Sequence, residues 1–189
     1  MAFSLIQILY WLALSTWFGG VLFVAVAAPI IFRTVREADP TLPRVLSVNL
    51  DSQHATLLAG SIVQNLLATL LRVELACAGA MGVAIFGQWF FIDRSGMALL
   101  APLLRSGMYV AAVALVIYDW RVVWPKVNRF REEFIEHADE PDVANPAKDE
   151  FDRYHQESVR VLSIVLFLLL GIVLFSGSIV PSVTVIRFE

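Results

Sequence analysis

Apolar residues in this chain come in four long blocks, and the segments between the blocks hold most of the charged residues. The blocks span about residues 5–32, 71–92, 97–122 and 160–181. About 20 helical residues are enough to cross the ~30 Å hydrocarbon core of a bilayer. The pattern therefore predicts an all-α integral membrane protein, a four-helix bundle that forms one transmembrane domain over residues 1–189.

The first block has a competing interpretation as a cleavable signal peptide, because Ala25-Val26-Ala27 resembles a cleavage site. No Lys or Arg precedes the block, however. Its apolar stretch is also longer than the roughly 7–15 residues typical of a signal peptide. We therefore expect the first block to be a retained helix.

Composition agrees with a lipid surrounding. Hydrophobic residues make up 58% of the chain and charged residues 16%, whereas soluble domains average about 45–50% and about 25%. The net charge of −3 gives no indication of a nucleic-acid partner. Cys77 is the single cysteine, which excludes an internal disulfide and a cysteine-based zinc site.

Lys and Arg predict the orientation of the four spans, because cytoplasmic loops of membrane proteins are enriched in them. Four spans place both termini and the short turn 93–96 on one face, which carries Arg94, Arg105 and Arg187. All the others of the 14 Lys and Arg residues belong to the opposite face. We expect loops 33–54 and 123–158 in the cytoplasm and both termini outside, in a bacterial cytoplasmic (inner) membrane.

Residues 55–71 form a predicted helix with a narrow, uncharged polar stripe. The stripe is made by Thr56, Gly60, Gln64, Ser61, Asn65 and Thr69 at helical spacing, with Asp51 or Ser52 as the candidate N-cap. An amphipathic helix on the membrane surface normally carries Lys and Arg on its polar face. An uncharged stripe instead suits packing against other helices. We therefore favour a helix continuous with the second span over a separate surface helix.

Helical patterns also extend the third and fourth spans on the predicted cytoplasmic side. The third helix is expected to continue past Trp124-Pro125 and to end at 139–142. Asn145-Pro146 is then the predicted N-cap and first-turn proline of a new helix that leads into the fourth span. Small residues at intervals of four, such as Ser15 and Gly19, predict close helix packing.

Charged residues near the predicted cytoplasmic ends of the second and third spans form a predicted polar cluster. Arg72 and Asp119 lie at similar depth if the two helices are antiparallel, with Glu74 and Arg121 nearby. The cluster is interpreted as an ion pair that fixes two helices, as snorkelling side chains, or as part of a polar pathway. Arg105 interrupts the third span; snorkelling outward is its candidate placement, with Gln88 as a candidate neighbour.

Two motifs give the chain a family resemblance. The first span contains Trp17-Phe18-Gly19-Gly20 and Ala28-Pro29-Ile30-Ile31-Phe32, and the fourth is preceded by Phe151-Asp152-Arg153-Tyr154-His155-Gln156-Glu157-Ser158. These motifs resemble those of a four-helix family called domain of unknown function 4149, which is related to transmembrane protein 205. Tyr154 stands where that family usually has leucine. The resemblance implies a four-helix fold and no established activity. It marks the following family-motif residues: Trp17, Gly19, Pro29, Phe32, Asp152, His155 and Ser158.

A metal site is one candidate chemistry. His54 and His155 both precede membrane spans on the same predicted face, and with Asp152 or Glu74 they supply imidazole and carboxylate ligands that suit several divalent metals. No tightly spaced ligand motif, nucleophile motif or phosphate-binding Gly-rich loop is present. We therefore predict no catalytic residues and no cofactor, and His155 is more simply a hydrogen-bonding residue.

Two classes of function stay open. The favoured one is a non-catalytic accessory or scaffolding subunit that acts through helix packing, with other membrane-protein helices or further copies of itself as partners. The alternative is a small carrier or binder of a metal ion or small molecule. The uncharged stripe and the small residues favour the first, and the polar cluster favours the second.

Overall fold

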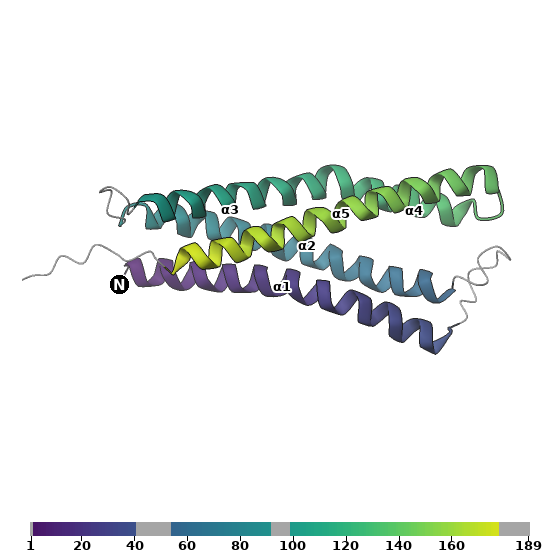
Figure 1. Cartoon of the computed structure of the whole chain (residues 1–189), viewed down its shortest axis with the longest axis horizontal. Coiled ribbons are helices and arrows are strands. Elements are labelled where there is room, and N and C mark those ends of the chain that lie inside the picture. The colour runs from purple at the N-terminus through teal and green to yellow at the C-terminus, as the bar shows by residue number, and fades with distance from the viewer. Residues whose placement is uncertain (1, 41–53, 92–98, 178–189) are drawn as a thin grey trace, which may run out of the picture.

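The structure, a computed structural model, describes residues 2–40, 54–91 and 99–177, and these form four long helical rods that lie side by side (Figure 1). The rods are α1 (Ala2–Ala38), α2 (His54–Gln88), a third rod made of α3 (Leu100–Tyr118), η3 (Asp119–Val123) and α4 (Trp124–Glu136), and α5 (Pro141–Ser176). No strand occurs in these ranges. The predicted all-α four-helix bundle is confirmed. The candidate caps Asp51 and Ser52 lie outside the described residues.

Each rod is longer than a membrane is thick. The rods hold 35 to 37 residues, which corresponds to about 55 Å at 1.5 Å per residue, against a hydrocarbon core of ~30 Å. All four are apolar enough over part of their length to cross a bilayer. The protein is therefore a multi-pass membrane protein, and its rods extend beyond the apolar part of the bundle.

The second rod distinguishes the two placements considered for residues 55–71. Helix α2 runs without a break from His54 to Gln88. The polar stripe therefore belongs to the same helix as the second span, as favoured above, and the separate surface helix is wrong.

The rods pack in two pairs. Helix α1 packs along α2, and α5 packs along α3 and α4, whereas contacts between the two pairs are fewer and run mainly through α1 with α5 and α2 with α3. Figure 1 shows α1 and α2 diverging from α4 and α5 toward the end where α4 lies. The bundle is thus closed over the apolar spans and opens at one end.

The third rod continues through Trp124-Pro125, as predicted, by means of a π-helical turn. Proline has no N–H to donate, and its ring collides with the carbonyl four residues earlier. The five residues of η3 immediately precede α4, which carries Pro125 in its first turn. A π-turn widens the backbone locally, and we attribute it here to Pro125. It lets one rod carry both a membrane span and its extension.

The start of the last rod differs from the prediction. Helix α5 begins at Pro141 with Glu140 at the N-cap position, and Pro146 lies inside the helix. Both Pro141 and Pro146 suit the first turn of a helix. Asp142, which follows Pro141, favours the earlier start because the negative charge of Asp142 complements the helix dipole. The assignment of Asn145-Pro146 as a cap was therefore wrong by about one helical turn.

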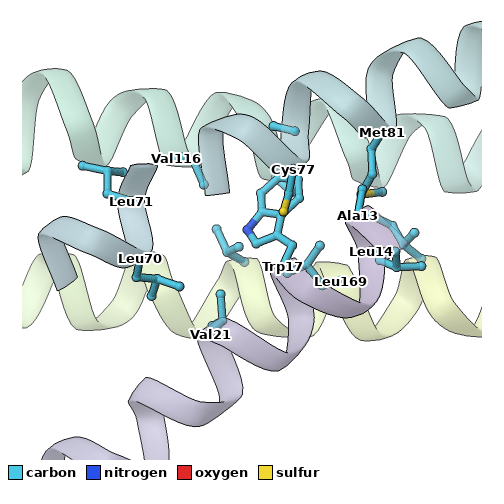
Figure 2. Packing of buried hydrophobic residues seen from close by; sticks show 14 of the residues in the cluster. Ala13, Leu14, Trp17, Val21, Leu70, Leu71, Cys77, Met81, Val116 and Leu169 are labelled. Carbon is cyan, nitrogen blue, oxygen red and sulfur yellow. The ribbon is translucent and has the colours of Figure 1, made fainter. Parts of the chain in front are cut away.

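The centre of the bundle is built around Trp17, whose side chain is fully buried. Figure 2 shows this indole of α1 among Cys77 of α2, Val116 of α3 and Leu169 of α5, so all four rods meet at one side chain. Side chains on the outside are apolar as well, for example Phe167, which is 72% exposed. An apolar exterior around an apolar core is what lipid, rather than water, tolerates.

Close helix contact depends on Gly82 of α2. The Tyr109 hydroxyl of α3 donates a hydrogen bond to the Ala78 carbonyl at 2.8 Å. A Cβ added at Gly82 would lie 2.6 Å from that hydroxyl oxygen, whereas a Cβ at Gly79 would meet nothing within 4 Å.

Replacing Gly82 should therefore destabilise the bundle, and replacing Gly79 should not. We expect Gly82→Ala to lower the free energy of unfolding by about 1–3 kcal/mol, because the side chain of Tyr109 must shift and lose its acceptor. Gly79→Ala, the matched control on the same helix, should be neutral or slightly stabilising. Thermal unfolding of both variants in one detergent checks this, and equal effects at the two positions would contradict it.

Candidate functional site

A cavity of about 280 Å³ lies where the two helix pairs diverge. It is bounded by the end of α1, the first half of α2, α4 and the first half of α5. Its lining is formed by Phe32, Thr56, Leu57, Gly60, Val63, Gln64, Leu67, Trp124, Val127, Arg131, Phe134, Lys148, Phe151, Asp152 and His155. We refer to this cavity as the end pocket.

The wall of the end pocket is mainly apolar and rich in rings. Phe32, Trp124, Phe134 and Phe151 come from three different rods, and aliphatic side chains of α2 complete the lining. Lining of this kind, with a few polar groups, is typical of sites for small molecules.

Arg131 of α4 connects the third rod to the polar stripe of α2. Its guanidinium donates to the Gln64 side-chain oxygen, to Ser61 Oγ at 2.6 Å and to the Leu57 carbonyl at 3.3 Å. Gln64 in turn donates to Asn128 Oδ1 at 2.5 Å. Gln64 and Ser61 of the uncharged stripe are therefore hydrogen-bonded to side chains of another helix, although α2 and α4 are not closely packed here.

Outside the apolar spans, the surroundings change the acidity of two pocket residues. Burial lowers the pKa of Arg131, and the neighbouring charge of Glu132 acts in the opposite direction. Arginine still stays charged at neutral pH, because its ordinary pKa lies far above neutrality. Desolvation lowers the pKa of His155 below its usual 6.5, opposed by Asp152. The imidazole of His155 is therefore mainly neutral at pH 7.

The α5 wall carries the remaining polar groups. Lys148 and Asp152 form an ion pair at 3.7 Å that is about half exposed. One turn further along, the His155 ring stacks on Phe151 with 5.7 Å between the ring centroids. This side of the pocket therefore presents an ion pair and an imidazole ring next to apolar walls.

The predicted metal ligands are not brought together. Asp152 and His155 both line the end pocket, but His54, which is buried at the first turn of α2, does not. Among the described residues, no group of three His, Cys, Asp or Glu side chains is placed to hold a metal ion. Asp152 instead has Lys148 as its partner.

The charged residues near the ends of the second and third spans are arranged differently from the prediction. Arg72 is exposed, and no ion pair joins it to Asp119. Glu74 is buried at 4% exposure, accepts a hydrogen bond from Trp17 Nε1 at 3.1 Å and lies close enough to Asp119 for the two charges to repel.

This difference follows from the angle between neighbouring positions on a helix. Residues two apart point about 200° away from each other at 100° per residue, so Arg72 and Glu74 cannot both face the bundle. The two helices do bring this part of α2 to the same depth as Asp119. Because of the rotation of α2 about its axis, however, the neighbour of Asp119 is Glu74 and not Arg72. Ser158 of α5 also lies near Asp119.

Arg105 does not snorkel outward. Its side chain is only 1% exposed, and its guanidinium carbon lies 5.1 Å from the centre of the Tyr10 ring. The candidate snorkelling placement of Arg105 was therefore wrong, because Tyr10 of α1 covers it.

The family-motif residues occupy three regions. Phe32, Asp152 and His155 line the end pocket. Trp17 donates a hydrogen bond to the buried Glu74, and Ser158 lies near Asp119. Gly19 and Pro29 lie on the exposed face of α1.

Arg131 was missed by the sequence analysis. Val127, Arg131 and Phe134 follow one another at steps of four and three, so they share one face of α4. Val127 is buried, and all three line the end pocket. This spacing was the available signal that Arg131 points toward the bundle.

No protein-family model, curated protein or solved structure matches this chain. The resemblance to domain of unknown function 4149 therefore stays a prediction.

Proposed function

We propose that this membrane protein binds a small amphipathic molecule in the end pocket. The observation that carries the proposal is a partly open pocket with ring-lined apolar walls and a few polar groups, formed by residues from all four rods. Its volume of about 280 Å³ is near the lower end of the ~300–1,000 Å³ that ligand pockets occupy. A molecule with a compact apolar body and a polar group fits both the size and the lining.

This arrangement removes one of the two arguments for an accessory subunit. The uncharged stripe on α2 suggested a partner helix from another chain. Gln64 and Ser61 already have Arg131 and Asn128 of the same chain as partners. The stripe therefore supports a pocket wall more directly than an interface.

Photocrosslinking tests the binding proposal without assuming the identity of the ligand. We would replace Phe134, a pocket residue, by p-benzoylphenylalanine, irradiate membranes and determine the masses of the adducts. The expected result is a small molecule of discrete mass that is absent when Phe167, an exposed side chain on α5, is replaced in the same way. Identical adducts at the two positions would refute selective binding.

A variant that fills the end pocket is the matched control for the crosslinking at Phe134. A Cβ at Gly60 would lie 3.8 Å from Arg131 Nη2, which is an ordinary contact, so a larger side chain is accommodated at the backbone and extends into the cavity. Gly60→Leu should lower the yield of the Phe134 adduct by about tenfold or more, corresponding to ~1.4 kcal/mol of binding. Gly79→Leu on the same helix should leave it unchanged.

The end pocket is proposed to open to the cytoplasm of a bacterial cell, with both termini on the outside. The support is the concentration of Lys and Arg in the segments at this end of the bundle. A reporter that is active only in the cytoplasm should give signal when inserted in the 137–140 turn and none when fused to the C-terminus. The reverse pattern would invert the topology.

A second candidate function is that of an accessory subunit which packs against a helix of another membrane protein. It is supported by the face of α1 that holds Ser15 and Gly19. Both residues are exposed, Ser15 bonds only to carbonyls of its own helix, and a Cβ at Gly19 would meet nothing within 4 Å. Such a small-residue face permits close approach of a further helix.

Purification in a mild detergent tests the accessory function. The native chain is expected to retain a partner, and Gly19→Leu should release it because the leucine keeps the helices apart. Phe167→Leu, a change at an exposed position on α5, should have no effect. A bare monomer for the native chain would count against this candidate.

A further inference from the structure

A cluster of buried polar side chains lies at the other end of the bundle, opposite the end pocket. Each rod contributes one residue: Tyr10 from α1, Gln88 from α2, Arg105 from α3 and Ser176 from α5. Tyr10, Gln88 and Arg105 are each at most 1% exposed. Such burial of polar groups between membrane helices is expensive and usually serves a purpose.

Tyr10 is held in a defined direction. Its hydroxyl lies 2.5 Å from Ser176 Oγ, and Ser176 donates its own hydrogen to the Ile172 carbonyl at 2.5 Å. Because a serine hydroxyl has one hydrogen, Tyr10 must be the donor to Ser176. The oxygen of Tyr10 is then free to accept a hydrogen bond, and the Arg105 guanidinium lies over the Tyr10 ring, 5.1 Å from its centre.

Arg105 retains unused donors after this contact. Nε and Nη2 have no hydrogen-bond partner within the described ranges, and no carboxylate in those ranges pairs with the guanidinium. Arginine cannot lose its charge in proteins. A buried, unpaired charge is strongly destabilising unless an opposite charge is supplied.

We propose that Arg105 is the centre of a binding site for a small monovalent inorganic anion. The N–H groups on Nε and Nη2 form a fork that donates to one acceptor. Because Arg105 and Gln88 are both buried, only a small occupant is compatible with this position. The Gln88 amide donates to Gln7 Oε1 at 2.6 Å, which turns its NH₂ group toward α1.

This anion site is independent of the proposed function. The end pocket has none of these residues in its lining. Loss of binding in one place therefore does not imply loss in the other.

Anion-dependent stability tests the proposal. The purified full-length protein in detergent would be unfolded thermally while chloride replaces gluconate at constant ionic strength. Chloride should raise the midpoint temperature of unfolding until the site is saturated. The expected rise is about 2–4 °C for each kcal/mol that anion binding adds to the stability. Arg105→Gln should remove the response, because the neutral side chain no longer needs an anion. Arg105→Lys, which keeps the charge without the fork, should retain a weaker response.

Broadening of the ³⁵Cl nuclear magnetic resonance line by the native protein supplies a measurement that does not rely on a variant. Bromide should reverse this broadening by competition. The proposal is overturned if chloride and gluconate stabilise the native protein equally, if Arg105→Gln responds like the native chain, or if no competable broadening is found.

Discussion

The constraint that governs this structure is that lipid offers no hydrogen bonds. A polar side chain in the apolar part of the bundle is therefore stabilised by a partner on another helix or on its own backbone. Trp17 meets Glu74 at 3.1 Å, and Tyr109 meets the Ala78 carbonyl at 2.8 Å. These contacts join α1 to α2 and α3 to α2, so the same bonds that satisfy polar groups also set the rotation of the helices.

The length of the rods has a second consequence. Because each rod exceeds the hydrocarbon thickness, the bundle has one part surrounded by lipid and another beyond it. In the second part the helix pairs diverge, and Arg131 spans the separation to reach Gln64 and Ser61. The end pocket exists because this long side chain holds the rods together without closing the space between them. The two proposed sites therefore differ in kind: the end pocket offers apolar, ring-lined space to a molecule that leaves water, whereas Arg105 offers a buried positive charge to an opposite charge.

Local pattern along the chain was enough to establish the four apolar rods, the continuity of α2 and the passage of the third rod through Pro125. These features could be predicted because hydrophobic length and helical spacing belong to one segment at a time. The family resemblance also drew attention to Phe32, Asp152 and His155, which line the end pocket. Local pattern misplaced the start of α5, where two prolines compete for the same first-turn position.

Which faces of the rods meet was settled by the assembled bundle. Glu74 rather than Arg72 faces Asp119, Arg105 is covered by Tyr10, and Arg131 reaches residues 67 and 70 positions earlier in the chain. The rotation of each helix about its axis depends on the packing of all four rods together. No single helix carries that information, so the end pocket and the environment of Arg105 emerge only when the rods are assembled.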